Sequence, residues 1–329
     1  MMTTSLPEPE LLEVVPWHYG FAHSWAMAWL IENAGTRDRL LDLLVPGGTA
    51  PWQLEGRVRR EHRVNGARAD LAFEVVDSVG RTVEVALETK VADPIKQTQL
   101  ERYRDAGRHV VLYVPGVTGM LFAPNGPVAG ETWVTGRQLA DALEGVELPW
   151  IVGSYVRAVA DEAGRMDRAR AFARRERDMP AEDDARFPAA DLVDAAWVAE
   201  AAWALIAAGA TGIRVRSEAN DRGLYWEGSR CEVPGANGVD LYLDVIADVR
   251  THRRAIALKV GGGQQADRWG CLERAVAARP PSTEWVPCRK RRSQTQMLWK
   301  LNATDLSAAE VVQPTLAAAQ FIVTLAENG

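Results

Sequence analysis

The chain has few cysteines and no long apolar run. Its 329 residues include three widely spaced cysteines, Cys231, Cys271 and Cys288. This number and spacing argue against a disulfide framework or a zinc site, and they favour a reducing cytoplasm. No stretch approaches the ~20 uninterrupted apolar residues of a membrane span. The first residues carry neither a basic region nor an apolar run, so no signal peptide and no membrane partner are expected.

Positive charge is also scarce overall, because 38 Lys and Arg residues oppose 44 Asp and Glu residues, giving a net charge of −6. The distribution is uneven, since residues 250–300 contain twelve basic and three acidic residues, a local charge of +9 against −15 elsewhere. The densest group, expected in a loop, is suited to phosphate contacts and comprises Arg289, Lys290, Arg291 and Arg292. The alternatives are a solvated loop or a patch that faces an acidic neighbouring domain.

The most regular pattern lies between residues 68 and 90. Apolar residues recur at every second position over 71–75 and 83–87, which is typical of half-buried strands. A three-residue loop at 78–80, with glycine at its last position, would join the strands into a hairpin. Pairing Leu71 with Leu87 and Phe73 with Val85 places every apolar pair on one face, and a one-residue slip would destroy the match.

The other face of this hairpin carries charged residues. In the same register Asp70 lies opposite Glu88, and Lys90 points to the same side. Because directly opposed carboxylates repel each other, the pair predicts a bound cation. Hard oxygen ligands on strands suit Mg²⁺ or Mn²⁺, and Lys90 would position or deprotonate an attacking water. The alternative is a solvated sheet face that happens to carry these residues.

A helix is expected after the hairpin. Asp93 is a suitable N-cap, Pro94 suits the first helical position, and Gly107 would end the helix. Gln99 and Tyr103 are four residues apart and would therefore share one face of this helix.

Together these segments resemble the PD-(D/E)XK nuclease superfamily, particularly bacterial members with Arg-x-Asp, Glu-x-Lys and Gln-Leu-x-x-Tyr patterns. The matching segments are residues 68–70, 88–90 and 99–103, and the resemblance covers about residues 17 to 115. It implies an α/β (α+β) fold with an αβββαβ restriction-endonuclease-like core and a mixed sheet. The implied activity is metal-dependent cleavage of nucleic acid.

The resemblance also implies roles for individual residues. Asp70 and Glu88 would bind Mg²⁺ or Mn²⁺, with the Thr89 carbonyl as a third ligand. Lys90 would be the catalytic lysine, and Gln99 would orient the lysine or the backbone. The remaining residues of the implied site are the supporting Tyr103 and a candidate acid from the first helix, Glu32.

The first helix carries other polar and aromatic residues that have simpler explanations. His23 and Ser24 are adjacent, so they do not face each other on a helix, and packing and capping explain them better than catalysis. Trp25 and Trp29 lie at helical core spacing, as do Trp197 and Trp203 in a later helix, which favours burial over base stacking.

The chain is expected to have three parts. These are a catalytic domain at 1–155, a basic helix with a linker at 156–188, and a second α+β domain at 189–329. The basic helix is expected to be solvated and to contain internal ion pairs. In the second domain, the expected helices are 190–208, 264–278 and 308–326, and the expected strands are 212–216, 223–226, 239–249, 254–260 and 297–301.

The second domain echoes the first in its order of elements. Residues 238–245 align by eye with 68–75, which places Asp240 at the position of Asp70 and puts Ala257 where Glu88 would be. One hypothesis is an internal duplication whose second copy has lost its metal site. The alternative is an ordinary α+β domain whose strands share a common pattern.

The sequence therefore predicts a cytoplasmic, Mg²⁺-dependent deoxyribonuclease that hydrolyses phosphodiester bonds by in-line attack of a metal-bound water. By resemblance, its setting would be restriction, phage defence or DNA repair. The second domain would supply DNA grip, dimerisation or target choice, so a second copy of the chain and a co-encoded protein are candidate partners besides DNA. Two alternatives remain: a nuclease-fold module that binds DNA or a protein without cutting, and a nuclease that cleaves RNA.

Overall fold

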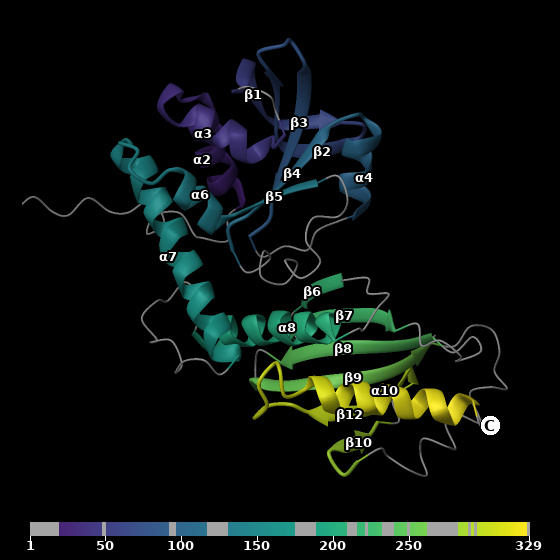
Figure 1. Cartoon of the computed structure of the whole chain (residues 1–329). Helices are drawn as coiled ribbons and strands as arrows, with labels where there is room; N and C mark the ends of the chain where they lie inside the picture. The colour runs from purple at the N-terminus through teal and green to yellow at the C-terminus, as the bar shows by residue number, and fades with distance from the viewer. Residues whose placement is uncertain are drawn as a thin grey trace, which may run out of the picture. The chain divides into compact units, whose positions relative to one another are not determined.

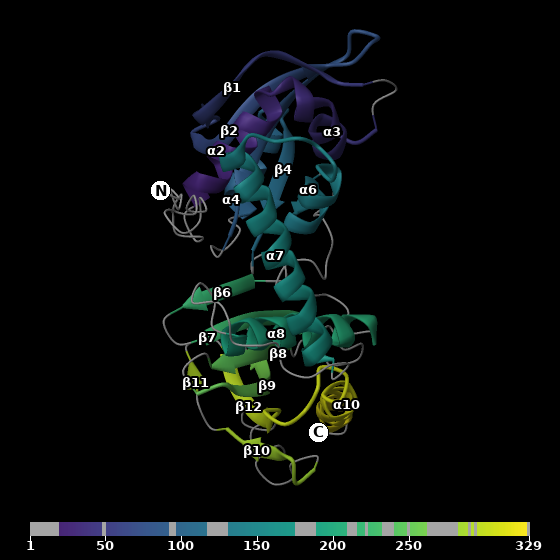
Figure 2. The same cartoon turned by 90° about the vertical axis from the view of Figure 1, so that its left-hand side faces the viewer.

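The chain divides into two compact units. The computed structural model describes residues 20–47, 51–91, 97–116, 131–174, 189–208, 216–220, 223–231, 240–248, 251–261, 282–288, 291–292 and 295–327. The first unit holds the described residues up to Met166, and the second holds those from Asp167 onwards (Figures 1 and 2). The boundary falls inside helix α7 (Trp150–Ala173), within the segment 156–188 expected to join the two domains.

The first unit is a mixed α/β structure built on a five-stranded sheet. In sheet order, the strands are β1 (Gln53–Val64), β2 (Ala67–Val76), β3 (Thr82–Thr89), β4 (His109–Val114) and β5 (Glu131–Thr135). The first three are antiparallel, whereas β4 is parallel to β3 and β5 is parallel to β4. The accompanying helices are α2 (Gly20–Glu32), α3 (Ala34–Leu44), α4 (Gln97–Asp105), α6 (Gly136–Ala142) and the first part of α7.

The predicted hairpin register is confirmed. Strands β2 and β3 pair Leu71 with Leu87 and Phe73 with Val85. The loop closes where expected, with the Asp77 N–H donating to the Arg81 carbonyl at 3.0 Å. Gly80 has a φ of 81°, the left-handed conformation that glycine adopts without steric cost. Local alternation and one turn glycine therefore suffice to set this register.

Each face of the first sheet packs against different helices. On one face, Ala86, Val110 and Leu112 pack with Leu100 and Tyr103 of α4. The opposite face carries an aromatic and histidine cluster. There the buried His23 of α2 lies 3.0 Å, Nδ1 to hydroxyl, from Tyr155 of α7, whose hydroxyl is 2.8 Å from that of Tyr113. This contact agrees with the packing role expected for His23.

Helix α4 ends as the sequence predicts. The Gly107 N–H donates to the Arg104 carbonyl at 2.8 Å, and the Arg108 N–H donates to the Tyr103 carbonyl at 3.0 Å. With a Gly107 φ of 72°, this is the Schellman arrangement that satisfies the last carbonyls of a helix. The expected N-cap Asp93 and Pro94 lie outside the described residues.

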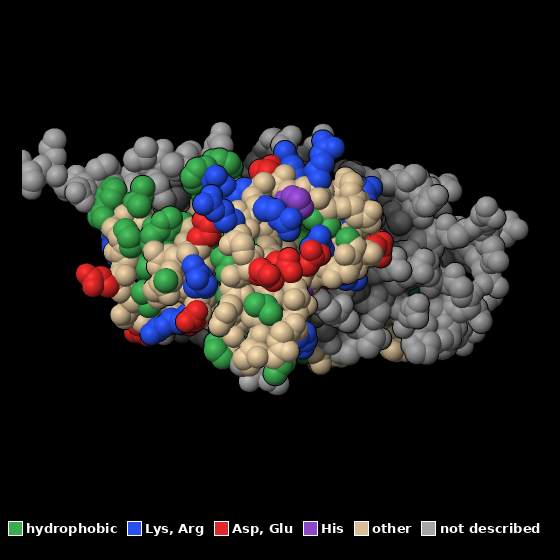
Figure 3. Space-filling view, turned by 90° about the horizontal axis from the view of Figure 1, so that it is seen from above, with side chains coloured by type: hydrophobic (Ala, Val, Ile, Leu, Met, Phe, Trp, Pro, Cys, Tyr) green, Lys and Arg blue, Asp and Glu red, His purple; other side chains and the backbone are tan. Residues whose placement is uncertain are grey.

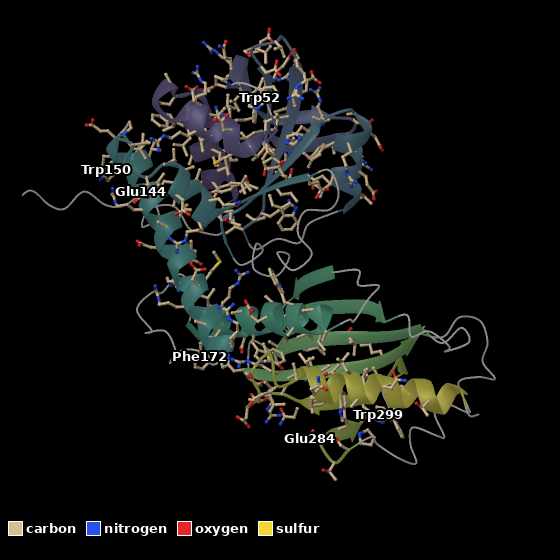
Figure 4. All side chains as sticks on the ribbon, viewed as in Figure 1. Trp52, Glu144, Trp150, Phe172, Glu284 and Trp299 are labelled. Carbon is tan, nitrogen blue, oxygen red and sulfur yellow. The ribbon has the colours of Figure 1, made fainter. Side chains whose placement is uncertain are left out.

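The second unit has its own sheet. Its strands in sheet order are β10 (Trp285–Pro287), β12 (Thr295–Asn302), β9 (Arg253–Gly261), β8 (Asp240–Asp248), β7 (Gly223–Cys231) and β6 (Arg216–Asn220), and β11 (Arg291–Arg292) also pairs with β12. The described helices are α8 (Ala189–Ala207) and α10 (Val312–Glu327). Large buried tryptophans mark each core, Trp52 in the first unit and Trp299 in the second, where Trp299 packs against Phe321 of α10 (Figure 4). The expected helix 264–278 lies outside the described residues.

The duplication hypothesis meets a difference in topology. Strands β7, β8 and β9 form an antiparallel meander like β1, β2 and β3, and both first strands contain a bulge. The next neighbour in the sheet differs, because β12 runs antiparallel to β9 whereas β4 runs parallel to β3. The second unit thus shares the three-strand meander with the first unit but not the parallel fourth strand.

The alignment of Asp240 with Asp70 is wrong. In the structure, Asp240 pairs with Gly261, whereas Asp244 pairs with Ala257 and forms an ion pair with Lys259. The arrangement of Asp70, Glu88 and Lys90 thus has a counterpart in the second sheet: Asp244 lies opposite Ala257, and Lys259 follows Ala257 by two residues. In this comparison Asp244 is the counterpart of Asp70, and Ala257 stands in place of Glu88.

Helix α7 is not the solvated helix that its charges suggest. Ala158, Val159 and Ala169 are buried, because apolar residues between the charges form a stripe along the helix. Arg165 does pair with Glu162 within the helix at 2.8 Å, but Arg170 pairs with Glu200 of α8 at 3.5 Å. Residues 175–188 lie outside the described part of the chain. Within the described helices, none combines the length and apolar character needed to cross a membrane.

Candidate active site

The candidate site lies where β2 begins and β3 ends. Asp70 is on β2, Glu88 and Thr89 are the last residues of β3, and Lys90 follows directly. Extending the observed β2–β3 register by one residue from the Leu71–Leu87 pair places Asp70 opposite Glu88. The hairpin alone thus brings the two carboxylates and the lysine together.

Hydrogen bonds hold both carboxylates. The Lys90 ammonium donates to Glu88 Oε1 at 2.7 Å, and the Tyr103 hydroxyl lies 3.1 Å from Glu88 Oε2. Asp70 Oδ2 accepts from the Thr89 backbone N–H at 2.8 Å. Glu88 is only 4% exposed, so its charge depends on these partners rather than on water.

Helix α4 supports the site through Gln99 and Tyr103. The Gln99 amide donates to the Tyr103 hydroxyl at 2.7 Å and to the Arg68 carbonyl at 3.1 Å. The Tyr103 hydroxyl also lies 2.7 Å from that carbonyl. Of the two roles expected for Gln99, its contacts match orientation of the backbone next to Asp70, and none of its described contacts is to Lys90. Burial, followed by the charge of Glu88, raises the pKa of Tyr103, so its hydroxyl remains a donor.

The electrostatics of the site favour an added cation. Burial, followed by the charge of Glu88, raises the pKa of Asp70 from 3.8 to about 7, against the opposing effects of the Thr89 N–H and the Lys90 charge. One lysine therefore does not compensate two neighbouring carboxylates. A divalent cation would keep Asp70 ionised at neutral pH.

The donor set fits a hard divalent ion. Asp70 and Glu88 offer carboxylate oxygens from rigid strands, which is the chemistry that Mg²⁺ and Mn²⁺ prefer. No group of three or more metal-ligating side chains occurs among the residues that the structure describes. Such an ion would therefore need the Thr89 carbonyl, water or a substrate oxygen to complete its coordination, and Lys90 would have to share Glu88 with it.

Glu32 does not join this site. Its carboxylate accepts from the Val58 backbone N–H at 3.1 Å, in a bulge where residues 56–58 of β1 lie opposite Phe73 alone. No described contact links it to Asp70 or Glu88. The side chain replaces a lost sheet hydrogen bond, which explains its place at the end of α2 without a catalytic role.

Glu61 is an acid near the site that the sequence patterns did not single out. Its charge contributes to the raised pKa of Asp70, and its carboxylate pairs with Arg68 at 2.8 Å. It lies on β1, the strand that precedes the β2–β3 hairpin. The left-handed φ of 51° at Glu61 could not be foreseen from an ordinary strand pattern.

The basic cluster is described only in part. Arg289 and Lys290 lie outside the described residues, whereas Arg291 and Arg292 form the short strand β11, paired with Gln296 and Thr295. The expectation of a loop is therefore wrong at these two positions. The phosphate-binding role of the cluster stays a prediction.

Comparisons of the chain with protein-family models, with curated proteins and with solved structures found no match.

Proposed function

We propose that the chain is a Mg²⁺- or Mn²⁺-dependent nuclease that hydrolyses phosphodiester bonds in DNA. The observation that carries the proposal is the set of Asp70, Glu88 and Lys90 at one end of the β2–β3 hairpin, with the pKa of Asp70 raised to about 7. Two carboxylates that need a cation, beside one lysine, suit hydrolysis of an anionic ester.

The order of elements in the first unit supports the same proposal. Helix α2 with α3, three antiparallel strands, helix α4 and the parallel strand β4 follow one another along the chain. This is the αβββαβ order of the PD-(D/E)XK core that residues 17–115 resemble. The support from α4 is specific, because Gln99 and Tyr103 touch the backbone at Arg68 and the side chain of Glu88.

Each residue would have a distinct task in hydrolysis. Asp70 and Glu88 would hold a divalent ion, which would supply Lewis acidity for the activation of water. The Thr89 N–H holds Asp70 Oδ2, which leaves Oδ1 for a ligand, and Tyr103 holds Glu88 Oε2 in place. Lys90, released from Glu88, orients the attacking water and offsets negative charge as it develops on the phosphate.

The proposal is tested by incubating circular, linear and single-stranded DNA, and a matched RNA, with the protein in Mg²⁺, Mn²⁺ or EDTA. Cleavage in either metal and none in EDTA is expected for the wild type, and Glu88→Gln should be inactive. Glu74→Gln is the matched control, because Glu74 lies opposite Glu84 in the same hairpin but away from Lys90. Cleavage in EDTA, or full activity of Glu88→Gln, would show that the assigned site is not the active site.

A second candidate is a nuclease-fold module that binds DNA or a protein without cutting. It is favoured by the fact that Lys90 and Tyr103 already occupy both oxygens of Glu88. Binding of DNA that is insensitive to Mg²⁺, with no cleavage of any substrate, would select this candidate. If RNA were the only substrate cleaved, the proposed hydrolysis would hold and only the substrate would differ.

A further inference from the structure

A cleft of about 560 Å³ lies between helix α2 and strand β1, away from the contacts of the Asp70–Glu88 pair. Trp25 and Trp29 line it from the helix, and Arg57 and Arg60 line it from the strand. No role in the proposed hydrolysis involves these four residues. Their combination of flat aromatic surface and positive charge calls for an explanation.

The aromatic side of α2 is exposed. Met27, Leu30 and Ile31 are buried, whereas Trp25 is 49% exposed and Phe21 is 57% exposed, with ring centroids 5.6 Å apart. The expectation that Trp25 is a core residue is therefore wrong. Its helical spacing is real, but it defines a second stripe on the outer side of the helix. Exposed aromatic surface beside a cleft is typical of a binding site.

The charge beside these rings is positive. The Arg60 guanidinium carbon lies 3.7 Å from the centroid of a Trp25 ring, and Arg57 is exposed. Neither arginine forms an ion pair with a carboxylate in the part of the chain that the structure describes. The one acid that lines the cleft, Glu32, is engaged by the Val58 N–H. Arg37 also lines the cleft, so three arginines and one acid face it and the net charge favours an anionic ligand.

The wall that carries these arginines is built by the bulge in β1. Glu55 pairs with Glu74 and Arg59 with Ala72, so residues 56–58 depart from the ladder, and Gly56 has a φ of 72°. A bulge of this kind changes the direction of nearby side chains and often lies beside a functional site. The hydrogen bond from the Val58 N–H to Glu32 joins this bulge to α2 and so connects the two walls of the cleft. On the face seen in Figure 3, Lys and Arg side chains adjoin hydrophobic ones.

We infer that this cleft binds an unpaired nucleotide, with the base on the tryptophan side and the phosphate at Arg57 and Arg60. A π-face and a guanidinium are the two groups that recognise a base and its phosphate without regard to sequence. A base in a duplex is stacked and paired, so it cannot enter the cleft. The occupant is therefore a nucleotide of a single strand or a free nucleotide, and both share this chemistry.

Binding is measured on the full chain in EDTA, by fluorescence anisotropy of labelled dT12 and of a 12-base-pair duplex, with unlabelled dTMP as a competitor. Trp25→Ala should weaken dT12 binding by about 5- to 150-fold, the loss of one base–aromatic stack. Trp203→Ala is the matched control, because Trp203 is 36% exposed on α8 and also lies under an arginine, Arg170. It should leave dT12 binding unchanged.

Replacing both cleft arginines, Arg57→Gln with Arg60→Gln, should lower the slope of log affinity against log salt by about 0.7, the value for one phosphate on a single strand. This pair keeps the result interpretable if Trp25→Ala fails to fold, which circular dichroism would show. Equal affinity of Trp25→Ala and wild type for dT12, or equal losses for dT12 and the duplex, would overturn the inference. If unlabelled dTMP displaces labelled dT12, a free nucleotide is sufficient for binding. If only an unlabelled oligonucleotide displaces it, the ligand is a single strand. Because the assay contains no metal, its result does not depend on whether the protein cleaves DNA.

Discussion

The charge of Asp70 offers a sensitive test of the candidate metal site. In the folded chain the pKa of Asp70 is raised from 3.8 to about 7, first by burial and then by Glu88. The folded state therefore holds a proton that the unfolded state has already released between about pH 4 and pH 7. Stability must fall as the pH rises through this interval and level off above it. At about 1.4 kcal/mol per pKa unit, the full rise from 3.8 to about 7 corresponds to a loss on the order of 4 kcal/mol in metal-free buffer.

The perturbation is Asp70→Asn, which keeps an oxygen acceptor for the Thr89 N–H but cannot ionise. Urea denaturation in EDTA at pH 5 and pH 8 measures the free energy of unfolding of both proteins. The wild type should lose about 2–3 kcal/mol more than the variant, because only the roughly two pH units between pH 5 and the pKa of about 7 contribute. The difference between the two proteins is the relevant quantity, because burial also raises the pKa of Glu131, and that contribution is common to both.

Mg²⁺ should reverse the loss in the wild type. At one hundred times its dissociation constant, a ligand that binds only the folded state adds about 2.7 kcal/mol. Asp70→Asn should respond weakly or not at all. Asp244→Asn is the control from the second sheet, since Asp244 faces Ala257 and pairs with Lys259. This substitution should reduce stability and leave the Mg²⁺ response intact. If wild type and Asp70→Asn lose the same free energy between pH 5 and pH 8, the reasoning about the carboxylate pair is refuted.

Four further predictions concern activity. Lys90→Ala and Glu88→Ala should each abolish metal-dependent cleavage of linear DNA while the far-UV circular dichroism spectrum stays native. If either variant cleaves DNA, the residue replaced in it is not part of the active site. Tyr103→Phe should slow cleavage and cost about 1 kcal/mol of stability, because it removes the one hydroxyl hydrogen that lies within reach of both Glu88 and the Arg68 carbonyl; wild-type kinetics would show that this hydroxyl is dispensable. Replacing residues 289–292 by Ala should weaken DNA binding at all sequences and lower the salt slope by up to about 3.6, with turnover at saturating DNA preserved; an unchanged slope would indicate a solvated segment. Glu32→Gln should leave the Mg²⁺ response unchanged, because its carboxylate serves the β1 bulge, and a lost response would restore it as a metal ligand.

The sequence by itself determined the local geometry of the candidate site. Alternation of apolar residues and Gly80 specify one hairpin register, because any slip would turn Leu71 and Phe73 to the wrong face. That register alone places Asp70 opposite Glu88. The four-residue spacing of Gln99 and Tyr103 puts both on one face of α4, and Gly107 ends that helix. Each of these features depends on residues close together in the chain or on a two-residue repeat.

Only the tertiary structure decided which faces meet. Periodicity shows that Trp25 shares a stripe with its neighbours, but the side of α2 that is buried carries the aliphatic residues Met27 and Leu30. Asp244, rather than Asp240, is the counterpart of Asp70 because pairing with β9 sets the register. Glu32 bonds Val58 because a bulge in β1, invisible in the residue pattern, leaves an N–H without a strand partner. Such contacts join elements distant in sequence, and the free energy of packing and of satisfying buried polar groups selects among faces that the local pattern leaves equivalent.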